Sequence, residues 1–125
     1  MTTLPIKSNN ATYSILCGDE YKDTYTGTIN GNACTIIARR VGRIVYLKIT
    51  WVGTASSSTR YNVCTIDEKY RPMEDVNVIV GNFVGSTWYG NAITRFIIGA
   101  NGIVSLITSE GSHTAKEASV TYIVD

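Results

Sequence analysis

The sequence predicts an all-β, antiparallel domain, and three observations support this prediction. The 125 residues include 15 Ile, 11 Val and 16 Thr, against only 4 Leu and 8 Ala. β-Branched side chains are restricted at χ1 and pack well on a pleated surface, whereas Leu and Ala favour helices. Eleven Gly interrupt the chain at short intervals, as turns do. No window combines the apolar periodicity of an amphipathic helix with helix caps.

Apolar runs bounded by turn residues predict eight or nine strands. We expect them over residues 12–18, 24–29, 34–40, 43–52, 60–66, 76–80, 92–98, 103–108 and 119–124. The clearest is 43–52, in which Val45, Leu47, Ile49 and Trp51 alternate with polar residues, the period of a half-buried strand. This number of strands is too large for one flat sheet, so we expect a β-sandwich or a barrel.

The segments between these strands carry turn and loop signals. Asn30-Gly31 and Asn101-Gly102 have the composition of tight hairpin turns. Residues 19–23 read as a polar loop, and residues 67–75 read as an irregular crossing loop. The glycine-rich segment 81–91 is either a long loop or a bent strand.

Length and charge limit the organisation and the classes of partner. A chain of 13.6 kDa is the size of one domain, and we expect an extended arm or shaft junction over residues 1–11 before a single β domain over residues 12–125. The net charge of +1 lacks the basic excess of a nucleic-acid-binding protein. No apolar run has the ~20 residues of a membrane helix, and no signal-peptide pattern begins the chain. We therefore expect neither nucleic-acid binding nor membrane insertion.

The cysteines indicate small buried residues rather than a metal site. Cys17, Cys34 and Cys64 are spaced too widely for a zinc motif, and His113 is the only histidine. Three cysteines cannot all pair within one chain, so we expect reduced thiols and folding in a reducing compartment. We expect no metal and no cofactor.

Some strands are apolar on both faces, which indicates a partner chain. Ile97 opposes Phe96 and Ile98, and Ile123 opposes Tyr122 and its apolar neighbours. A two-sheet domain of this size has one interior, so a second apolar face is most simply covered by a symmetric copy. The alternative is that bulges and twist bring both faces into one core.

The segment 85–91 is the strongest candidate for a ligand platform. Trp88 and Tyr89 stand there among small polar residues, and Asn91 follows them. Flat aromatic faces stack on sugar rings, and polar neighbours supply hydrogen bonds. Arg95 and His113 are possible polar neighbours. The alternative is that Trp88 or Tyr89 folds back into the core or into a subunit interface.

Signatures of an enzyme are sparse, and we expect no catalysis. His113 lies in a polar segment, and Glu110 is the nearest carboxylate in sequence, with nothing to indicate a nucleophile. The carboxylate pairs Asp67-Glu68 and Glu74-Asp75 could in principle hydrolyse a glycoside. The alternative, a small glycan-active enzyme, therefore depends on these four residues.

Four segments carry a resemblance to a known family. They are Gly42–Trp51, Ile66–Pro72 with its Tyr70-Arg71-Pro72 motif, Arg95–Val104, and Val120–Asp125. Their order resembles the C-terminal head domains of tailed-phage receptor-binding, tail-fibre and baseplate proteins, over roughly residues 35–125. Animal-virus fibre heads such as adenovirus knobs end in a similar Tyr-bearing strand.

The resemblance implies a homotrimeric β head that binds host-surface saccharide or receptor on the virion, beside other fibre or baseplate proteins. It implies folding in the host cytoplasm or nucleus. The family's sugar contacts vary between members, so it assigns no binding residue here. The alternatives are a structural virion component, such as a decoration or baseplate connector, and an animal-virus fibre head.

Overall fold

The structure is a computed structural model that describes residues 20–53, 58–84, 87–108 and 115–125, with side chains outside this description at 81–93, 115 and 116. It contains eight strands and one short 3₁₀ turn, η1. In chain order these are β1 (Glu20–Ile29), β2 (Asn32–Val41), β3 (Ile44–Val52), β4 (Arg60–Thr65), η1 (Glu68–Tyr70), β5 (Val76–Val84), β6 (Thr87–Ile98), β7 (Ile103–Thr108) and β8 (Ala115–Ile123).

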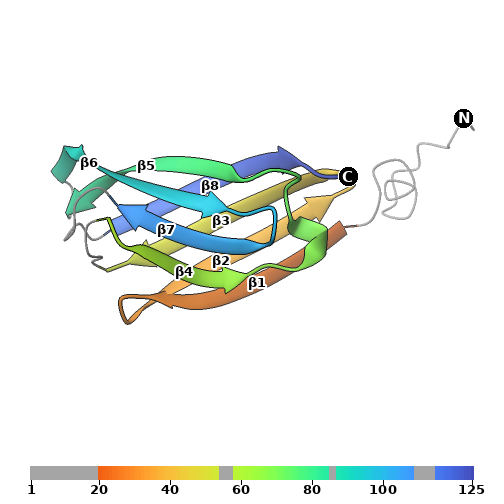
Figure 1. Cartoon of the computed structure of the whole chain (residues 1–125), viewed down its shortest axis with the longest axis horizontal. Helices are drawn as coiled ribbons and strands as arrows, with labels where there is room; N and C mark the ends of the chain where they lie inside the picture. The colour runs from red at the N-terminus through yellow and green to blue at the C-terminus, as the bar shows by residue number, and fades with distance from the viewer. Residues whose placement is uncertain (1–19, 54–57, 85–86, 109–114) are drawn as a thin grey trace, which may run out of the picture.

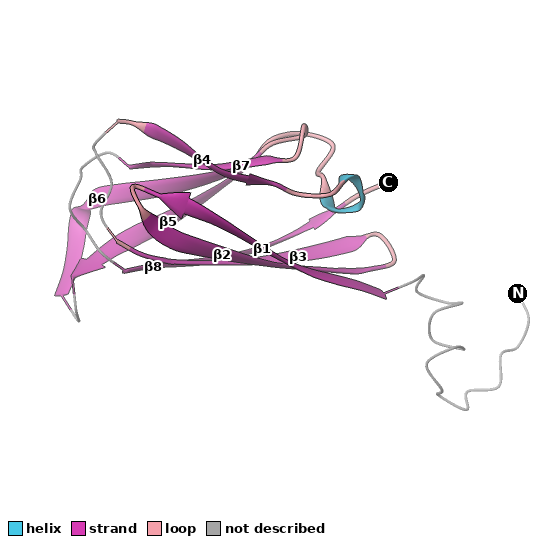
Figure 2. Ribbon diagram, turned by 90° about the horizontal axis from the view of Figure 1, so that it is seen from below, coloured by secondary structure: helices cyan, strands magenta, loops and turns pink. Residues whose placement is uncertain are grey.

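The strands form two antiparallel four-stranded layers, a β-sandwich (Figures 1 and 2). The first sheet has the order β1-β2-β3-β8, and the second has the order β5-β6-β7-β4. A single residue pair, Phe83 with Ala115, links β5 to β8 and joins the two sheets at one corner. The all-β sandwich predicted from composition is therefore confirmed.

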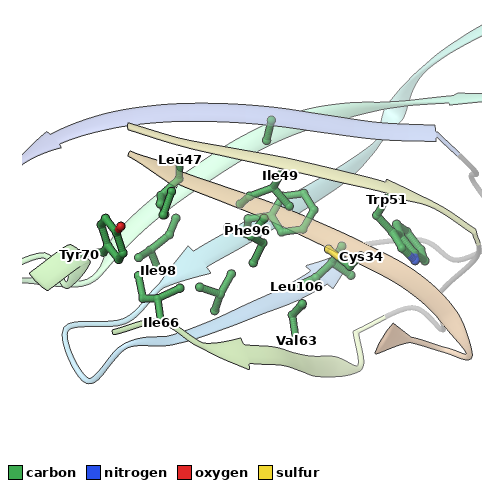
Figure 3. Packing of buried hydrophobic residues seen from close by; sticks show 14 of the residues in the cluster. Cys34, Leu47, Ile49, Trp51, Val63, Ile66, Tyr70, Phe96, Ile98 and Leu106 are labelled. Carbon is green, nitrogen blue, oxygen red and sulfur yellow. The ribbon is translucent and has the colours of Figure 1, made fainter. Parts of the chain in front are cut away.

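One continuous core lies between the sheets, and strand alternation explains it. In β3, Val45, Leu47, Ile49 and Trp51 are all buried, as their period of two predicts. The second sheet contributes apolar side chains from β6 and β7, with Phe96 near the centre. Figure 3 shows Trp51 and Tyr70 at opposite ends of this core.

The strands that are apolar on both faces are oriented as their pattern predicts. Phe96 and Ile98 are fully buried in the core, whereas Ile97 points to the outer face and is still only 6% exposed. Ile123 lies on the outer face of β8 and is 61% exposed. The outer face of the second sheet is therefore largely covered at Ile97, and the outer face of the first sheet is open at Ile123.

Two predicted boundaries were wrong and one open alternative is resolved, because pairing partners decide strand ends. Residues 20–23, predicted as a loop, pair with β2 from Val41 to Ala38. β8 begins at Ala115 rather than at residue 119, because β3 extends far enough to pair with it. Residues 87–91 belong to β6, which confirms the bent-strand alternative for the backbone of this part of the segment. The predicted strand over residues 12–18 and the arm over residues 1–11 lie outside the described residues.

The edges opposite the β5–β8 corner are brought together by a glycine. β1 and β4 are neighbours at this side of the sandwich (Figure 1). A Cβ atom at Gly27 of β1 would lie far inside contact distance of the Val63 carbonyl oxygen of β4. The missing side chain of Gly27 therefore lets the two edge backbones approach each other.

Candidate functional site

The predicted aromatic platform lies near the β5–β6 connection. Trp88 pairs with Phe83, and Tyr89 pairs with Asn82. The pairing then shifts, so that β6 contains three more residues than β5 before Ile93 pairs with Gly81. Asn91 lies in this irregular stretch. The side chains of these residues lie outside the described part of the structure, as does His113.

Arg95 lies further along β6, on the outer face of the second sheet. It is exposed and pairs with Ile79 of β5 and Ile107 of β7. The β5 partners of Arg95 and Trp88 are Ile79 and Phe83, four positions apart, which corresponds to about 13 Å of strand. Arg95 and Trp88 therefore belong to the same sheet, and their grouping in one saccharide site stays a prediction.

Two of the four carboxylates of the predicted crossing loop have structural partners. Asp67 caps η1 by accepting a hydrogen bond from the Glu68 backbone nitrogen at 2.8 Å, and it accepts another from Lys69 Nζ at 2.6 Å. These bonds, that of Lys69 first, lower the pKa of Asp67. Asp75 accepts a hydrogen bond from the Ala100 backbone nitrogen at 2.9 Å. Asp67 is thus held as a carboxylate, the opposite of what a general acid requires.

The Tyr70-Arg71-Pro72 motif joins the two sheets. Tyr70 is fully buried, and its hydroxyl donates a 2.6 Å hydrogen bond to Asp23 of β1. Its ring packs edge-on against Tyr25, with centroids 6.3 Å apart. Tyr122 of β8 donates a hydrogen bond to the Tyr70 carbonyl oxygen. The motif identified through the family resemblance is therefore a structural junction.

Arginines extend this junction to the neighbouring turns. Arg71 Nε donates to the Ile66 carbonyl oxygen at 3.1 Å and lies against Gly102, where a side chain would collide with it. Arg40 of β2 donates to the Lys69 carbonyl oxygen at 2.7 Å and to the Gly42 carbonyl oxygen at 2.6 Å. The η1 loop is consequently held against the first sheet and against the β6–β7 turn.

A small charged and aromatic cluster is exposed beside this junction. Lys69 Nζ lies 2.6 Å from Asp67 and 3.5 Å from Asp23, and about 5 Å above the rings of Tyr21 and Tyr70. The ammonium group of Lys69 neutralises part of the negative charge of Asp67 and Asp23. We interpret these contacts as stabilising the η1 loop.

The two described cysteines are free, as the sequence predicts. Cys34 is buried, and Cys64 is half-buried. Burial, and then the neighbouring Cys64, raise the pKa of Cys34 to about 12, and burial raises that of Cys64 to about 11. Both thiols are therefore neutral near pH 7 and act as small apolar groups.

The described residues form neither a metal-type cluster nor a membrane-spanning helix. No three His, Cys, Asp or Glu side chains among them are grouped to hold a metal ion. Within the same residues, no helix is long and apolar enough to cross a membrane.

Comparisons with known proteins leave the family open. The chain matches no protein-family model, and no curated protein matches it either.

Sequence reasoning missed Arg60 and Ser105 as a pair. Arg60 Nε and Nη2 both donate to Ser105 Oγ, at 3.1 and 3.0 Å. The residues are 45 positions apart, and only the pairing of β4 with β7 brings them together. Alternation in β4 and β7 could have placed both on outward faces, but no local signal pairs these strands.

Proposed function

We propose that this chain is a non-catalytic head domain of a virion attachment protein that binds a host cell-surface saccharide. The observation that carries the proposal is the packing of the segments that resemble phage heads into one unit. Tyr70 is contacted by Tyr122 of the terminal strand, and Arg71 lies against Gly102 of the β6–β7 hairpin. Motifs that are far apart in the sequence thus contact each other at one end of the β-sandwich. Such contacts are what we expect if the motifs belong to one domain family.

The outer face of the first sheet supports self-association as part of this proposal. Ile44 and Ile123 are directly paired across β3 and β8 and are 55% and 61% exposed. Tyr46 lies on the same face and is also exposed. We propose that this apolar row lies in the contact of a homotrimer, in which three equivalent weak saccharide sites raise the avidity.

Light scattering on a sizing column tests the trimer. Three chains of 13.6 kDa should give a mass about three times that of one chain. Ile44→Asp should shift the mass to that of one chain, because it places a charge in the contact. Ile79→Asp is the matched control, since Ile79 is 69% exposed against 55% for Ile44 but lies on the other sheet. A wild-type mass of one chain would contradict the proposed trimer.

A glycan panel tests saccharide binding and the proposed platform. Trp88→Ala and Tyr89→Ala should each abolish binding in a folded protein, whereas Tyr21→Ala, which removes an exposed aromatic side chain from β1, should not. If Trp88→Ala and Tyr89→Ala bind as the wild type does, the platform is elsewhere. If no glycan or cell surface is bound at all, attachment is the wrong function.

The same exposed row favours a second candidate function, that of a structural virion component. Ile44 and Ile123 could contact a fibre or baseplate protein instead of a second copy of this chain. This alternative predicts no glycan binding, and it predicts that Ile44→Asp prevents incorporation into particles.

A further inference from the structure

The outer face of the second sheet carries two arginines in one row. Arg60 pairs with Ile107, and Ile107 pairs with Arg95. Residues paired across antiparallel strands project from the same face. Arg60 and Arg95 therefore share this face, two strands or about 10 Å apart at their backbones.

Arg60 is held over the face rather than extended from the sheet edge. Its two hydrogen bonds to Ser105 Oγ, at 3.1 and 3.0 Å, draw the guanidinium from the edge strand β4 across β7. Ser105 is fully buried beneath it. The bonds use Nε and one N–H of Nη2, so three of the five guanidinium N–H donors are left for a ligand. Fixing an arginine in advance lowers the entropy cost of binding.

The adjacent row adds two exposed amides. Asn62 pairs with Ser105, Ser105 with Ile97, and Ile97 with Asn77. Both asparagines are exposed, whereas Ile97 between them is 6% exposed. Amide groups both donate and accept hydrogen bonds, which suits the hydroxyl groups of a saccharide.

The charge of this face is positive and unopposed in its described part. The side chains described there include no aspartate, glutamate or lysine; they are Arg60, Asn62, Thr65, Asn77, Ile79, Arg95, Ile97, Ile103, Ser105 and Ile107. Guanidinium groups bind carboxylate and sulfate groups through paired hydrogen bonds. Charge complementarity therefore requires an anionic occupant.

The exposed apolar side chains of this face are separated rather than contiguous. Ile79 is 69% exposed and pairs with the exposed Arg95, whereas Ile97 beside it is nearly covered. The centre of a specific protein interface is depleted of charged residues. A polar anionic ligand with a small footprint fits the face better.

We propose that this face binds an anionic saccharide, with Arg95 and Arg60 contacting its carboxylate or sulfate groups and Asn62 and Asn77 its hydroxyl groups. The inference rests on the proposed saccharide-binding function. It adds a second binding surface to the one proposed at Trp88 and Tyr89. Ser105 is a positioning residue, since it acts through Arg60.

Binding to three immobilised polymers tests the proposal. Dextran sulfate carries sulfates on a neutral backbone, hyaluronan carries carboxylates, and dextran is the neutral control. We expect at least one acidic polymer to bind more than tenfold more tightly than dextran. Which of the two binds identifies the preferred anion. Binding to neither acidic polymer would overturn the proposal.

Matched variants separate this site from diffuse charge. Arg95→Ala and Arg60→Ala should each weaken binding of the acidic polymer about tenfold. Arg39→Ala, which removes the same charge from an exposed strand position of the first sheet, should weaken it less than twofold. Equal losses in the Arg39 and Arg95 variants would overturn the proposal.

Ser105 variants test the positioning role. Ser105→Ala should weaken binding several-fold without changing the net charge, and Ser105→Thr should restore it, because threonine keeps the hydroxyl acceptor. If Ser105→Thr does not recover the affinity, orientation of Arg60 by Ser105 is not the cause.

Two other outcomes distinguish this inference from the proposed function. If Trp88→Ala abolishes saccharide binding and Arg95→Ala leaves the affinity unchanged, the head function stands and the arginine face is not a site. If Arg95→Glu changes the solution mass, the face is an interface between copies and the proposal is overturned. If no saccharide binds, both proposals fail.

Discussion

The η1 loop and the outer face of the second sheet use arginine and other polar side chains in different ways. At the η1 loop, Arg40, Arg71 and Tyr70 all donate hydrogen bonds to groups of the same chain. On the outer face, Arg60 donates hydrogen bonds to Ser105 but stays exposed, and Arg95 is exposed as well. Most polar groups thus stabilise the fold in the first region, whereas the two arginines face solvent in the second. Substitutions in the first region should change stability, and substitutions in the second should change binding.

The largest expected effect is the loss of the Tyr70 side chain. Because Tyr70 is fully buried, Tyr70→Ala should lower the free energy of unfolding by about 3–5 kcal/mol. Urea denaturation at neutral pH measures this. Tyr70→Phe keeps the ring and removes only the hydrogen bond to Asp23, so it should lose about 1–2 kcal/mol.

A tyrosine outside the core is the matched control for the loss of stability in Tyr70→Ala. Tyr21 belongs to the neighbouring β1 strand but is 41% exposed, and Tyr21→Ala should change the stability by less than about 1 kcal/mol. Equal losses for Tyr70→Ala and Tyr21→Ala would show that the η1 loop does not anchor the two sheets.

A smaller loss is expected where the edge strands meet. Gly27→Ala places a methyl group against the Val63 carbonyl oxygen and should cost about 1–3 kcal/mol, as overpacking does. Gly31→Ala is the comparison, because Gly31 has open space around it but a φ of +84°; strain alone should cost about 1 kcal/mol. Thermal unfolding of both variants measures the difference. A Gly27→Ala protein as stable as the wild type would mean that the edges separate easily.

Alkaline solution should destabilise the core. Burial raises the pKa of Cys34 from 9.0 to about 12, so the unfolded state loses its thiol proton first as the pH rises. The stability from this group is complete below about pH 9 and declines above it, by up to about 1.4 kcal/mol per pH unit. Urea midpoints at about pH 8 and about pH 10.5 measure the decline. Cys34→Ala should reduce the decline; an unchanged slope would exclude Cys34 as a cause.

The smallest expected effect is a shift in the titration of Asp67. Hydrogen bonds from Lys69 and from the Glu68 backbone lower its pKa below 3.8. The corresponding stabilisation is present above the ordinary pKa and is lost as the pH falls below about 4. Carboxyl NMR should show the lowered pKa, and Lys69→Ala should return it toward 3.8. A normal pKa in the wild type would show that the ion pair does not form in solution.

The sequence predicts the sandwich and most strand faces, because both follow from local alternation. Trp51 and Phe96 are buried where their periods place them. The start of β1 was missed because Glu20 and Lys22 carry no apolar signal; their strand state comes from pairing with β2. Alternation fails at this end of β1 because Asp23, which is half-buried and bonds to Tyr70, is polar as well.

The candidate site was less predictable, because it depends on contacts between distant strands. Arg95 as a polar neighbour of Trp88 stays a prediction, and the register also groups Arg95 with Arg60 and Ser105, which no local signal indicates. The roles of Tyr70 and Arg71 required knowledge of β8 and of the β6–β7 turn. Only the family resemblance indicated that these segments belong together.

The contact between Gly27 and Val63 also bears on aggregation. An edge strand with free N–H and C=O groups can recruit a strand from another chain, which leads to domain swapping or fibrils. Where the backbones of β1 and β4 approach each other, there is no room for such an added strand. At high concentration, copies of this chain would therefore be less able to cross-link through the β1 and β4 edges at this contact.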